Sequence, residues 1–218
     1  ETHRQSSHGL WGHLDSNRPR VSSERQSESP IRVGFVSPDF GQHPLGRFLL
    51  GAFEALDPDR LQAVCFSDRI QVDAFTDRFR SVSSEWFDIR GRSDELVAEW
   101  VEAAGVDVLV DLAGHTGRHR LGVFARRPAP LQMTWIGYPS TTGLPAIDVL
   151  LADDVLVPVG SERYFSERIE RLVGGHISYL PGTDCPDVVG RPESGAVVFG
   201  SFNKLDKTNR EVLLAWAE

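Results

Sequence analysis

One run of eight residues constrains the fold of this chain more than any other feature. Val106–Ala113 reads VDVLVDLA and is apolar almost throughout. Such a run is typical of a β-strand that is covered on both faces, and strands of that kind belong to parallel sheets packed between helices. The run therefore predicts an α/β fold built on a parallel sheet.

Apolar runs and helical patterns alternate along the rest of the chain from residue 31. Helical spacing follows the first strand over Leu45–Leu56 and recurs over Leu96–Ala104, where Ser93 is placed as the N-cap. A short helix is expected near Leu121–Arg126. Further strands are predicted at Ile31–Ser37, Leu61–Ser67, Trp86–Ile89, Leu131–Gly137, Asp148–Ala152 and Val197–Phe202. This alternation predicts βαβ units around the sheet.

The composition of the chain argues against binding to nucleic acid and against a membrane-spanning helix. The 218 residues include 31 Asp and Glu against 23 Lys and Arg, a net charge of −8, and an acidic body argues against a nucleic-acid binder. No apolar run approaches the roughly 20 residues of a membrane-spanning helix, and the first residues lack the apolar core of a signal peptide. Two cysteines make no disulfide framework, so we expect a cytoplasmic protein with Cys65 in the core and Cys185 in a loop.

The two ends differ from the middle of the chain. Residues 1–30 are rich in Ser, Arg, Gln and His and are expected to be a linker. Near the other end, Thr208 and Glu211 have the spacing of a capping box that opens a helix. Because the last βα unit is not completed, we expect a fragment cut inside a second domain, with a first domain over 31–195 and the start of the second over 196–218.

The loops after the predicted strands are polar and rich in glycine. They comprise residues 37–46, 114–119, 138–143 and 203–209. Ligands of an open parallel sheet collect at the carboxyl ends of its strands, where these loops lie. Neither the G-x-G-x-x-G fingerprint nor a Walker A pattern is present, which weakens the dinucleotide and P-loop interpretations.

Histidines in two of these loops each have two interpretations. His43, after the first strand, suits a base or a polar contact, and it also fits an ordinary surface histidine. His115 and His119 are four residues apart and, with Asp111, have the spacing of metal ligands. Gly117 between them favours a loop without a metal.

Hydroxyl and lysine side chains in the other loops are equally open to two interpretations. The run 140–142 beside Gly143 either binds a ligand or caps the next helix. Lys204 and Lys207 flank the start of a helix, where a lysine and a helix N-terminus form a phosphate cradle. Two lysines in such a place are also typical of a solvated face.

Taken together, three strings resemble the catalytic region of the O-linked N-acetylglucosamine transferases. They are RVGFVSPDFGQHPLGRFL, DVLVDLAGHTGRHRLGVFARRPAPLQMTWIGYPSTTG and FGSFNKLDKTN. The resemblance is to the bacterial members, which carry tetratricopeptide repeats ahead of that region. It covers residues 31–218 in the same order and spacing, and residues 1–30 resemble the spacer after the repeats.

The resemblance implies both a fold and an activity. The family has a GT-B fold, with two Rossmann-like lobes and the site between them, and this chain would supply the first lobe and the first strand and helix of the second. Family members use neither a metal nor a cofactor. They move N-acetylglucosamine from UDP-GlcNAc to Ser/Thr hydroxyls of protein acceptors, with inversion. The alternatives are a related cytoplasmic transferase that uses Asn acceptors or another UDP-hexose, and a non-catalytic protein-binding remnant.

The resemblance also implies roles for individual residues. His43 matches the active-site histidine of D-F-x-x-H-P, and Lys207 matches the lysine of F-N-x-L-x-K that contacts the donor diphosphate. The loop that lines the cleft near the sugar is matched by Tyr138, Pro139, Thr142 and Gly143. Substrate contacts are also expected from His115, Thr116, Asn203 and Lys204.

Three positions depart from the family pattern. Arg47 stands where the animal enzymes have a second histidine, Lys204 replaces a residue that is often Gln or Asn, and Glu102 stands where the animal enzymes have another histidine. These differences concern peripheral contacts and not the family.

Overall fold

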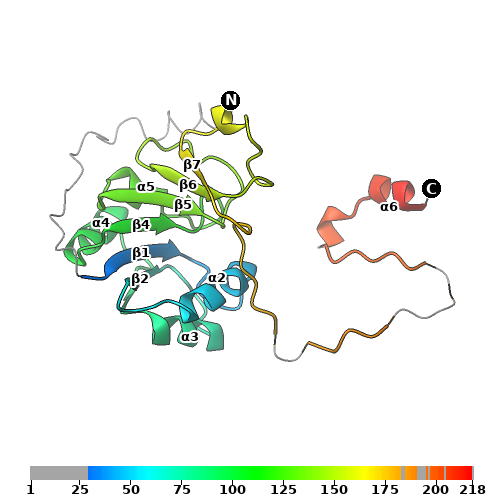
Figure 1. Ribbon diagram of the computed structural model, residues 1–218, viewed down its shortest axis with the longest axis horizontal. Coiled ribbons are helices and arrows are strands. Elements are labelled where there is room, and N and C mark those ends of the chain that lie inside the picture. The colour runs from blue at the N-terminus through cyan, green and yellow to red at the C-terminus, as the bar shows by residue number, and fades with distance from the viewer. Residues whose placement is uncertain (1–28, 183–184, 191–194, 196, 204, 218) are drawn as a thin grey trace. The chain divides into compact units, whose positions relative to one another are not determined.

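A computed structural model describes residues 29–182, 185–190, 195, 197–203 and 205–217 of the chain. The chain divides into two compact units, one ending at Pro181 and the other beginning at Gly182. The first unit contains a seven-stranded sheet (Figure 1). Its strands are β1 (Ile31–Ser37), β2 (Leu61–Ser67), β3 (Glu85–Asp88), β4 (Val108–Asp111), β5 (Leu131–Trp135), β6 (Val149–Ala152) and β7 (Arg168–Arg171).

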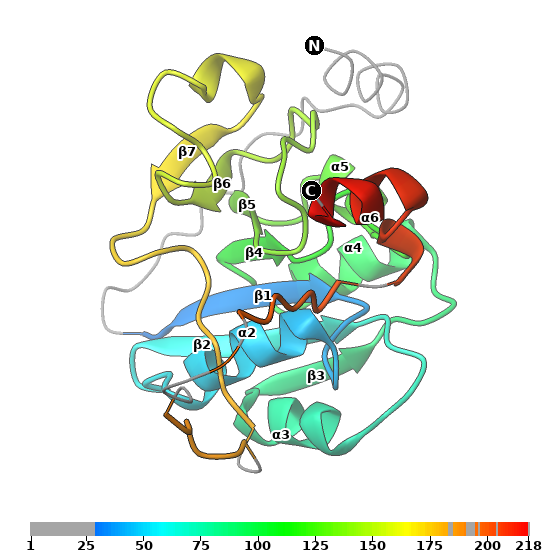
Figure 2. The same cartoon turned by 90° about the vertical axis from the view of Figure 1, so that its right-hand side faces the viewer.

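All seven strands run parallel, in the spatial order β3-β2-β1-β4-β5-β6-β7. Figure 2 shows the strands following one another in this order. The chain builds outward from β1 to β3 and then returns to place β4 on the other side of β1. The order of strands therefore reverses between β1 and β4, and open α/β sheets bind their ligands at such a switch point. This architecture confirms the predicted Rossmann-like α/β fold.

Helices cover both faces of the sheet, and the alternating side chains of β1 show how. Val33 and Phe35 pack in one apolar layer with α2 and α3, whereas Val36 packs in the other with α4 and α5. This two-residue period is that of a strand between two helical layers. The helices are α2 (Pro44–Glu54), α3 (Ala74–Val82), α4 (Asp94–Ala103) and α5 (Leu121–Ala125). None of the helices in the described residues is long and apolar enough to cross a membrane.

The strands predicted in the first unit agree with the sheet to within two residues at each end. The expected N-cap of α4 is also confirmed, since the Ser93 side chain accepts a hydrogen bond from the Leu96 amide at 3.3 Å. Two elements, α3 and β7, were not expected. Helix α3 buries only Thr76 and Phe79, and β7 is a four-residue edge strand with the sequence RIER. Neither has the apolar period on which the prediction relied.

The cysteines lie where they were expected. Cys65 is buried in β2, with its Sγ 3.1 Å from Oγ of Ser83, and burial raises the pKa of this thiol to about 12. Cys185 is exposed, and both thiols are free.

In the second unit, the strand expected at Val197–Phe202 is not formed. The structure describes residues 197–203 without a strand, and Val198 and Phe199 are 90% and 92% exposed. A strand needs a neighbour to satisfy its backbone groups, and no described segment pairs with this one. The prediction was therefore wrong for the chain as the structure describes it.

The capping box expected at Thr208 and Glu211 is also wrong, although the helix is present. Helix α6 (Arg210–Ala217) begins one residue later than predicted. Asn209 caps it, because its side-chain oxygen accepts from the Val212 amide at 2.9 Å. The Thr208 amide instead donates to the Leu205 carbonyl at 2.8 Å, which closes the short 3-10 helix η2 (Leu205–Lys207).

Candidate active site

Two histidine-bearing loops follow the strands of the switch point. The loop after β1 ends at His43, and the loop after β4 contains His115. Both leave from the carboxyl edge of the sheet, as expected from the sequence.

His43 is the N-cap of α2. Its Nδ1 accepts a hydrogen bond from the Leu45 amide at 3.3 Å, and Pro44 occupies the next position, where a missing N–H has no cost. A ring nitrogen that accepts carries no proton, so neutral His43 in this arrangement carries its proton on Nε2. The Asp39 carboxylate lies 3.7 Å from Nδ1, and the His43 side chain is 45% exposed. His43 is thus oriented by its own helix and still accessible to a ligand.

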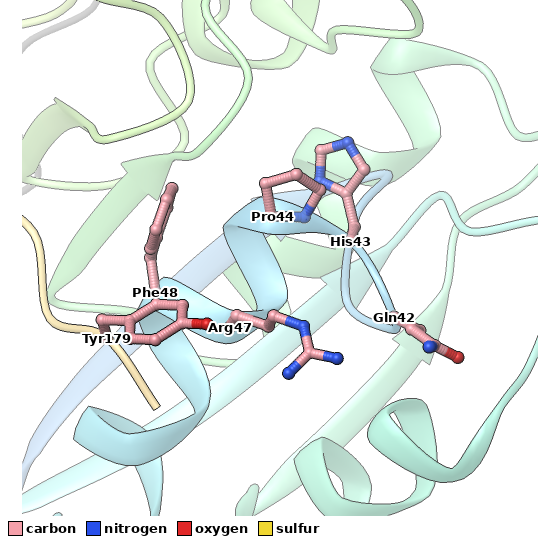
Figure 3. Close-up of a pocket in the computed structure, with 6 residues that line it drawn as sticks. All are labelled: Gln42, His43, Pro44, Arg47, Phe48 and Tyr179. Carbon is pink, nitrogen blue, oxygen red and sulfur yellow. The ribbon is translucent and has the colours of Figure 1, made fainter. Parts of the chain in front are cut away.

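A cavity of about 240 Å³ lies beside His43 (Figure 3). It is lined by Gln42, His43, Pro44, Arg47, Phe48 and Tyr179. Tyr179 comes from a segment far along the chain. It is placed there because the Leu180 amide donates to the Arg47 carbonyl at 2.9 Å and because the Tyr179 and Phe48 rings lie 6.3 Å apart.

A larger hollow, of about 370 Å³, lies at the opposite edge of the sheet. Its lining includes Leu61 and Gln62 at the start of β2 and Ser84 just before β3. This is the amino edge of the strands, and none of the expected site residues lines it. Because ligands of open α/β sheets bind at the carboxyl edge, the cavity beside His43 is the better candidate.

The loop that carries His43 packs against the first turn of α2 and is hydrogen-bonded to α3. A Cβ atom at Gly46 would lie 2.0 Å from the Gly41 carbonyl oxygen, so the first turn of α2 packs against the loop only because residue 46 is glycine. Phe40, a residue of the same loop, is fully buried. Its carbonyl accepts a hydrogen bond from the Thr76 hydroxyl of α3 at 2.9 Å.

Asp73 ties the same loop to the beginning of α3. Its carboxylate accepts hydrogen bonds from the Gln42 amide at 2.8 Å and from the Thr76 amide at 3.0 Å, and it pairs with Arg69 at 2.5 Å. Burial alone would raise the pKa of Asp73, but these interactions outweigh it and lower that pKa to about 2. Asp73 is therefore ionised throughout the neutral range and supports the His43 loop as an anion.

The loops after β4 and β5 are joined through His115. Its Nε2 donates to the Thr142 carbonyl at 2.7 Å, and its ring meets the Tyr138 ring edge-on, with centroids 5.5 Å apart. Gly114 makes this possible: its φ is +53°, and a Cβ there would lie 2.3 Å from Cβ of Tyr138. The structure thus brings together three of the expected site residues, His115, Tyr138 and Thr142.

Thr116 and His119 are engaged within the loop after β4. The Thr116 hydroxyl donates to the Ala113 carbonyl at 2.7 Å, and Nδ1 of His119 accepts from the Leu121 amide at 3.4 Å. Burial, and then the charge of His115, lower the pKa of His119. The expectation that Thr116 contacts substrate stays a prediction.

Glu167 is a site residue that sequence reasoning missed. This carboxylate is buried, accepts from the Thr142 amide at 2.8 Å and from the Thr141 hydroxyl at 2.7 Å, and also accepts from the Thr142 hydroxyl. The hydroxyls of residues 141 and 142 thus face the protein interior. A single acidic residue before a polar edge strand gives no signal of this role in the sequence.

Exposure varies along the rest of the loop after β5, in which Gly143 is buried. Pro139 is exposed, Tyr138 is half-buried, and Gly143 has a φ of +67° that favours glycine. With both threonine hydroxyls taken by Glu167, a ligand would meet the backbone of this loop and the Tyr138 ring. That Tyr138, Pro139, Thr142 and Gly143 contact the sugar stays a prediction.

Asp111 is buried at the end of β4 and supports the loop that follows this strand. Burial raises the pKa of its carboxyl, against the hydrogen bonds it accepts. Its hydrogen-bond donors are the amides of Ala113 at 3.1 Å and Gly114 at 2.8 Å and the hydroxyl of Thr134 at 2.8 Å. Across the described ranges, no group of three or more His, Cys, Asp or Glu side chains is arranged to hold a metal ion.

The remaining expected residues belong to the second unit. Lys207 is exposed at the end of η2, three residues ahead of α6. Asn203 is exposed, with its side-chain amide 3.4 Å from Oγ of Ser201. Lys204 lies outside the described residues. The roles expected for Asn203, Lys204 and Lys207 stay predictions.

Comparisons with known proteins agree with the resemblance noted in the sequence. The "Probable UDP-N-acetylglucosamine--peptide N-acetylglucosaminyltransferase SPINDLY" of Arabidopsis thaliana is 37% identical over 199 residues, which cover 88% of this chain and 22% of that protein. The UDP-N-acetylglucosamine--peptide N-acetylglucosaminyltransferase of Caenorhabditis elegans is 28% identical over 176 residues, covering 74% of this chain and 15% of that protein. This chain thus spans less than a quarter of the length of either of these curated relatives.

A solved structure extends the likeness to the fold. The O-GlcNAc transferase of Thermobaculum terrenum, solved as a mutant, matches all of this chain and 46% of its own with a TM-score of 0.84 and 35% identity. In addition, residues 16–180 match the sequence profile of "Glycosyl transferase family 41". That match covers most of the chain and includes both histidine loops, and the chain therefore belongs to glycosyl transferase family 41.

Proposed function

We propose that this chain is part of a longer protein O-GlcNAc transferase, in which residues 31–195 form the N-terminal lobe of a GT-B fold. The enzyme would transfer N-acetylglucosamine from UDP-GlcNAc to Ser/Thr hydroxyls, with inversion and without a metal or a cofactor. The observation that carries the proposal is the agreement of the whole chain with the T. terrenum O-GlcNAc transferase in both sequence and fold. His43 beside its cavity and the joined loops after β4 and β5 support the proposal, because they lie at the carboxyl edge of the sheet, where open α/β sheets bind ligands.

The chemistry requires a hydroxyl that attacks and a group that controls its proton. In the observed arrangement, neutral His43 presents Nε2–H to its surroundings, because Nδ1 caps α2. His43 is therefore suited to donate a hydrogen bond to substrate. To act as a general base through Nε2 it would first have to give up the cap and shift its proton to Nδ1, beside Asp39.

The departing diphosphate needs stabilisation as negative charge develops on it. We assign this task to Lys207, which is exposed and lies just ahead of α6. An ammonium group and the N-terminus of a helix both favour an anion. Because charge on the diphosphate grows as the glycosidic bond breaks, such a site would stabilise the transition state more than the bound donor.

The partners that we propose are proteins. The relatives are named as peptide N-acetylglucosaminyltransferases, and tetratricopeptide repeats ahead of residue 1 would be the expected means of acceptor binding. The absence of nucleic-acid binding is expected from the acidic composition, and a cytoplasmic location from the two cysteines that make no disulfide framework.

The competing functions are a transferase that uses Asn acceptors or another UDP-hexose, and a non-catalytic protein-binding remnant. A donor panel separates them. The longer protein is incubated with a protein extract and, in turn, UDP-GlcNAc, UDP-glucose and UDP-galactose, and the acceptors are analysed by mass spectrometry. We expect modification with UDP-GlcNAc above the other donors. Preferred transfer of a hexose supports the second function, and no transfer from any donor supports the third.

A further inference from the structure

Arg47 is a cation with no described acidic partner. It lines the cavity beside His43, and no carboxylate of the described residues lies within 4.0 Å of its guanidinium, whereas neighbouring arginines such as Arg69 and Arg78 are paired with acids. The Arg47 guanidinium instead lies over the Phe75 ring, 5.2 Å from its centroid. A cation that faces a cavity without a counter-ion is available to an anion that enters it.

Both the backbone and the side chain of Arg47 are restrained by neighbouring residues. Its carbonyl accepts the Leu180 amide at 2.9 Å, and contact with an aromatic face restrains a guanidinium while leaving its N–H groups free. In Figure 3 the guanidinium extends past the Tyr179 ring toward the side of Gln42, and the His43 imidazole points the other way. The planar fork that recognises carboxylates in two-point fashion is thus presented to the cavity.

We propose that Arg47 selects acceptors that carry an acidic residue within three positions of the modified Ser or Thr. This inference rests on the proposed function, because it takes His43 to mark the reacting hydroxyl. His43 is the extended N-cap of α2, and Arg47 lies one turn further along, where its amide donates to the His43 carbonyl at 3.1 Å. In an extended peptide, side chains two residues apart lie about 7 Å from each other on the same side. Three positions of an extended peptide span about 10 Å, so an acceptor whose hydroxyl lies at His43 can place an acidic side chain at Arg47 although the two side chains diverge.

The cavity fits an acceptor side chain better than it fits the donor diphosphate. Beside Gln42 and His43, its walls include the rings of Pro44, Phe48 and Tyr179, which suit the apolar part of an Asp or Glu side chain. Among the described residues that line the cavity, Arg47 is also the only Arg or Lys. A single guanidinium among aromatic rings matches one carboxylate, and a diphosphate is usually held by several donors.

The test compares three acceptor peptides that differ only at the positions flanking one Ser: Glu, Ala or Lys. The longer enzyme is assayed as wild type and as Arg47→Gln, Arg47→Glu and Arg60→Glu, and kcat/KM is measured for each peptide together with KM for UDP-GlcNAc. Arg60 is the matched control, since it is exposed at the amino edge of the sheet and its reversal changes the net charge equally. Thermal melting verifies that each variant is folded.

We expect wild type and Arg60→Glu to favour the Glu peptide over the Lys peptide by about three- to tenfold, the scale of a partly exposed ion pair. Arg47→Gln should remove this preference and Arg47→Glu should reverse it, with KM for UDP-GlcNAc unchanged. Equal use of the three peptides by the wild type overturns the inference and leaves the proposed function intact. So does a higher KM for UDP-GlcNAc in folded Arg47→Gln with the preference retained, since Arg47 would then contact the donor. No transfer to any peptide overturns both.

Discussion

At the scale of single residues, His43 caps α2 with one ring nitrogen and leaves the other for a ligand. In the longer enzyme, His43→Ala should lower kcat by about 10²-fold or more, the scale for a positioned proton-transfer or transition-state hydrogen-bond group. KM for UDP-GlcNAc should change much less. Steady-state kinetics with both substrates varied gives the two constants separately.

His43→Asn is the control for the structural role of this residue. Asparagine is a good N-cap and retains the acceptor for the Leu45 amide, whereas alanine loses about 1 kcal/mol of helix stability. We therefore expect His43→Asn to melt near the wild type and still to be as inactive as His43→Ala. Near-normal turnover of either variant would return His43 to the interpretation of an ordinary surface histidine.

Lys207 and Lys204 offer a second matched pair. Lys207→Ala should lower kcat by roughly 10²–10³-fold, the scale for one preorganised donor at a developing charge, and Lys207→Arg should recover little because a planar fork does not replace a compact ammonium. Lys204→Ala should be much milder. Measured kcat values that rank the two lysines in the opposite order would contradict the assignment of the diphosphate to Lys207.

At the scale of elements, the junction of the His43 loop with α3 depends on an ionised Asp73. Its folded pKa of about 2 lies below the usual value of 3.8, so the unfolded chain binds more protons between these values. The stabilisation is complete above about pH 4 and is lost as pH falls toward 2.

Asp73→Asn should lower the free energy of unfolding by about 1 kcal/mol at pH 7, and the difference from wild type should shrink at pH 3. Urea unfolding at both pH values measures this, with the exposed Asp77→Asn of the same helix as control. A difference that does not depend on pH would show that the Asp73 charge is not involved.

The elements that the sequence predicted well are those whose apolar residues repeat with a clear period. Strand β1 shows Val33 and Phe35 on one face and Val36 on the other, and α4 has its N-cap where Ser93 predicted it. Helix α3 and strand β7 were not predicted from the sequence, because they bury few side chains and so lack an apolar period. The strand predicted at Val197–Phe202 is not formed, because an apolar run becomes a strand only where another strand pairs with it.

The candidate site could be predicted to a similar degree. Loops at the carboxyl ends of strands are visible in the sequence, so His43 and His115 were found. The buried carboxylate of Glu167 and the side chain of Tyr179 were not, since each reaches its loop from a distant segment. Contacts of this kind arise from tertiary packing and leave no local pattern.

At the scale of the whole molecule, the proposed enzyme needs a second lobe, and this chain spans 46% of the T. terrenum structure. The purified 218-residue chain should therefore show no transfer from UDP-GlcNAc, because most of the lobe that binds the uridine would be missing. An assay with radiolabelled donor and a protein extract tests this. Transfer above background by the 218-residue chain would show that the catalytic unit is smaller than we propose.

The central claim is that this lobe serves the transfer of N-acetylglucosamine to hydroxyl side chains of proteins. The most direct measurement incubates the longer enzyme, as wild type and as His43→Asn, with UDP-GlcNAc and a protein extract, and locates the modified residues by fragmentation mass spectrometry that preserves the sugar. Our account predicts an added N-acetylhexosamine on Ser and Thr residues with the wild type and its near absence with His43→Asn. An added sugar on Asn residues, or equal modification by the two proteins, would contradict it.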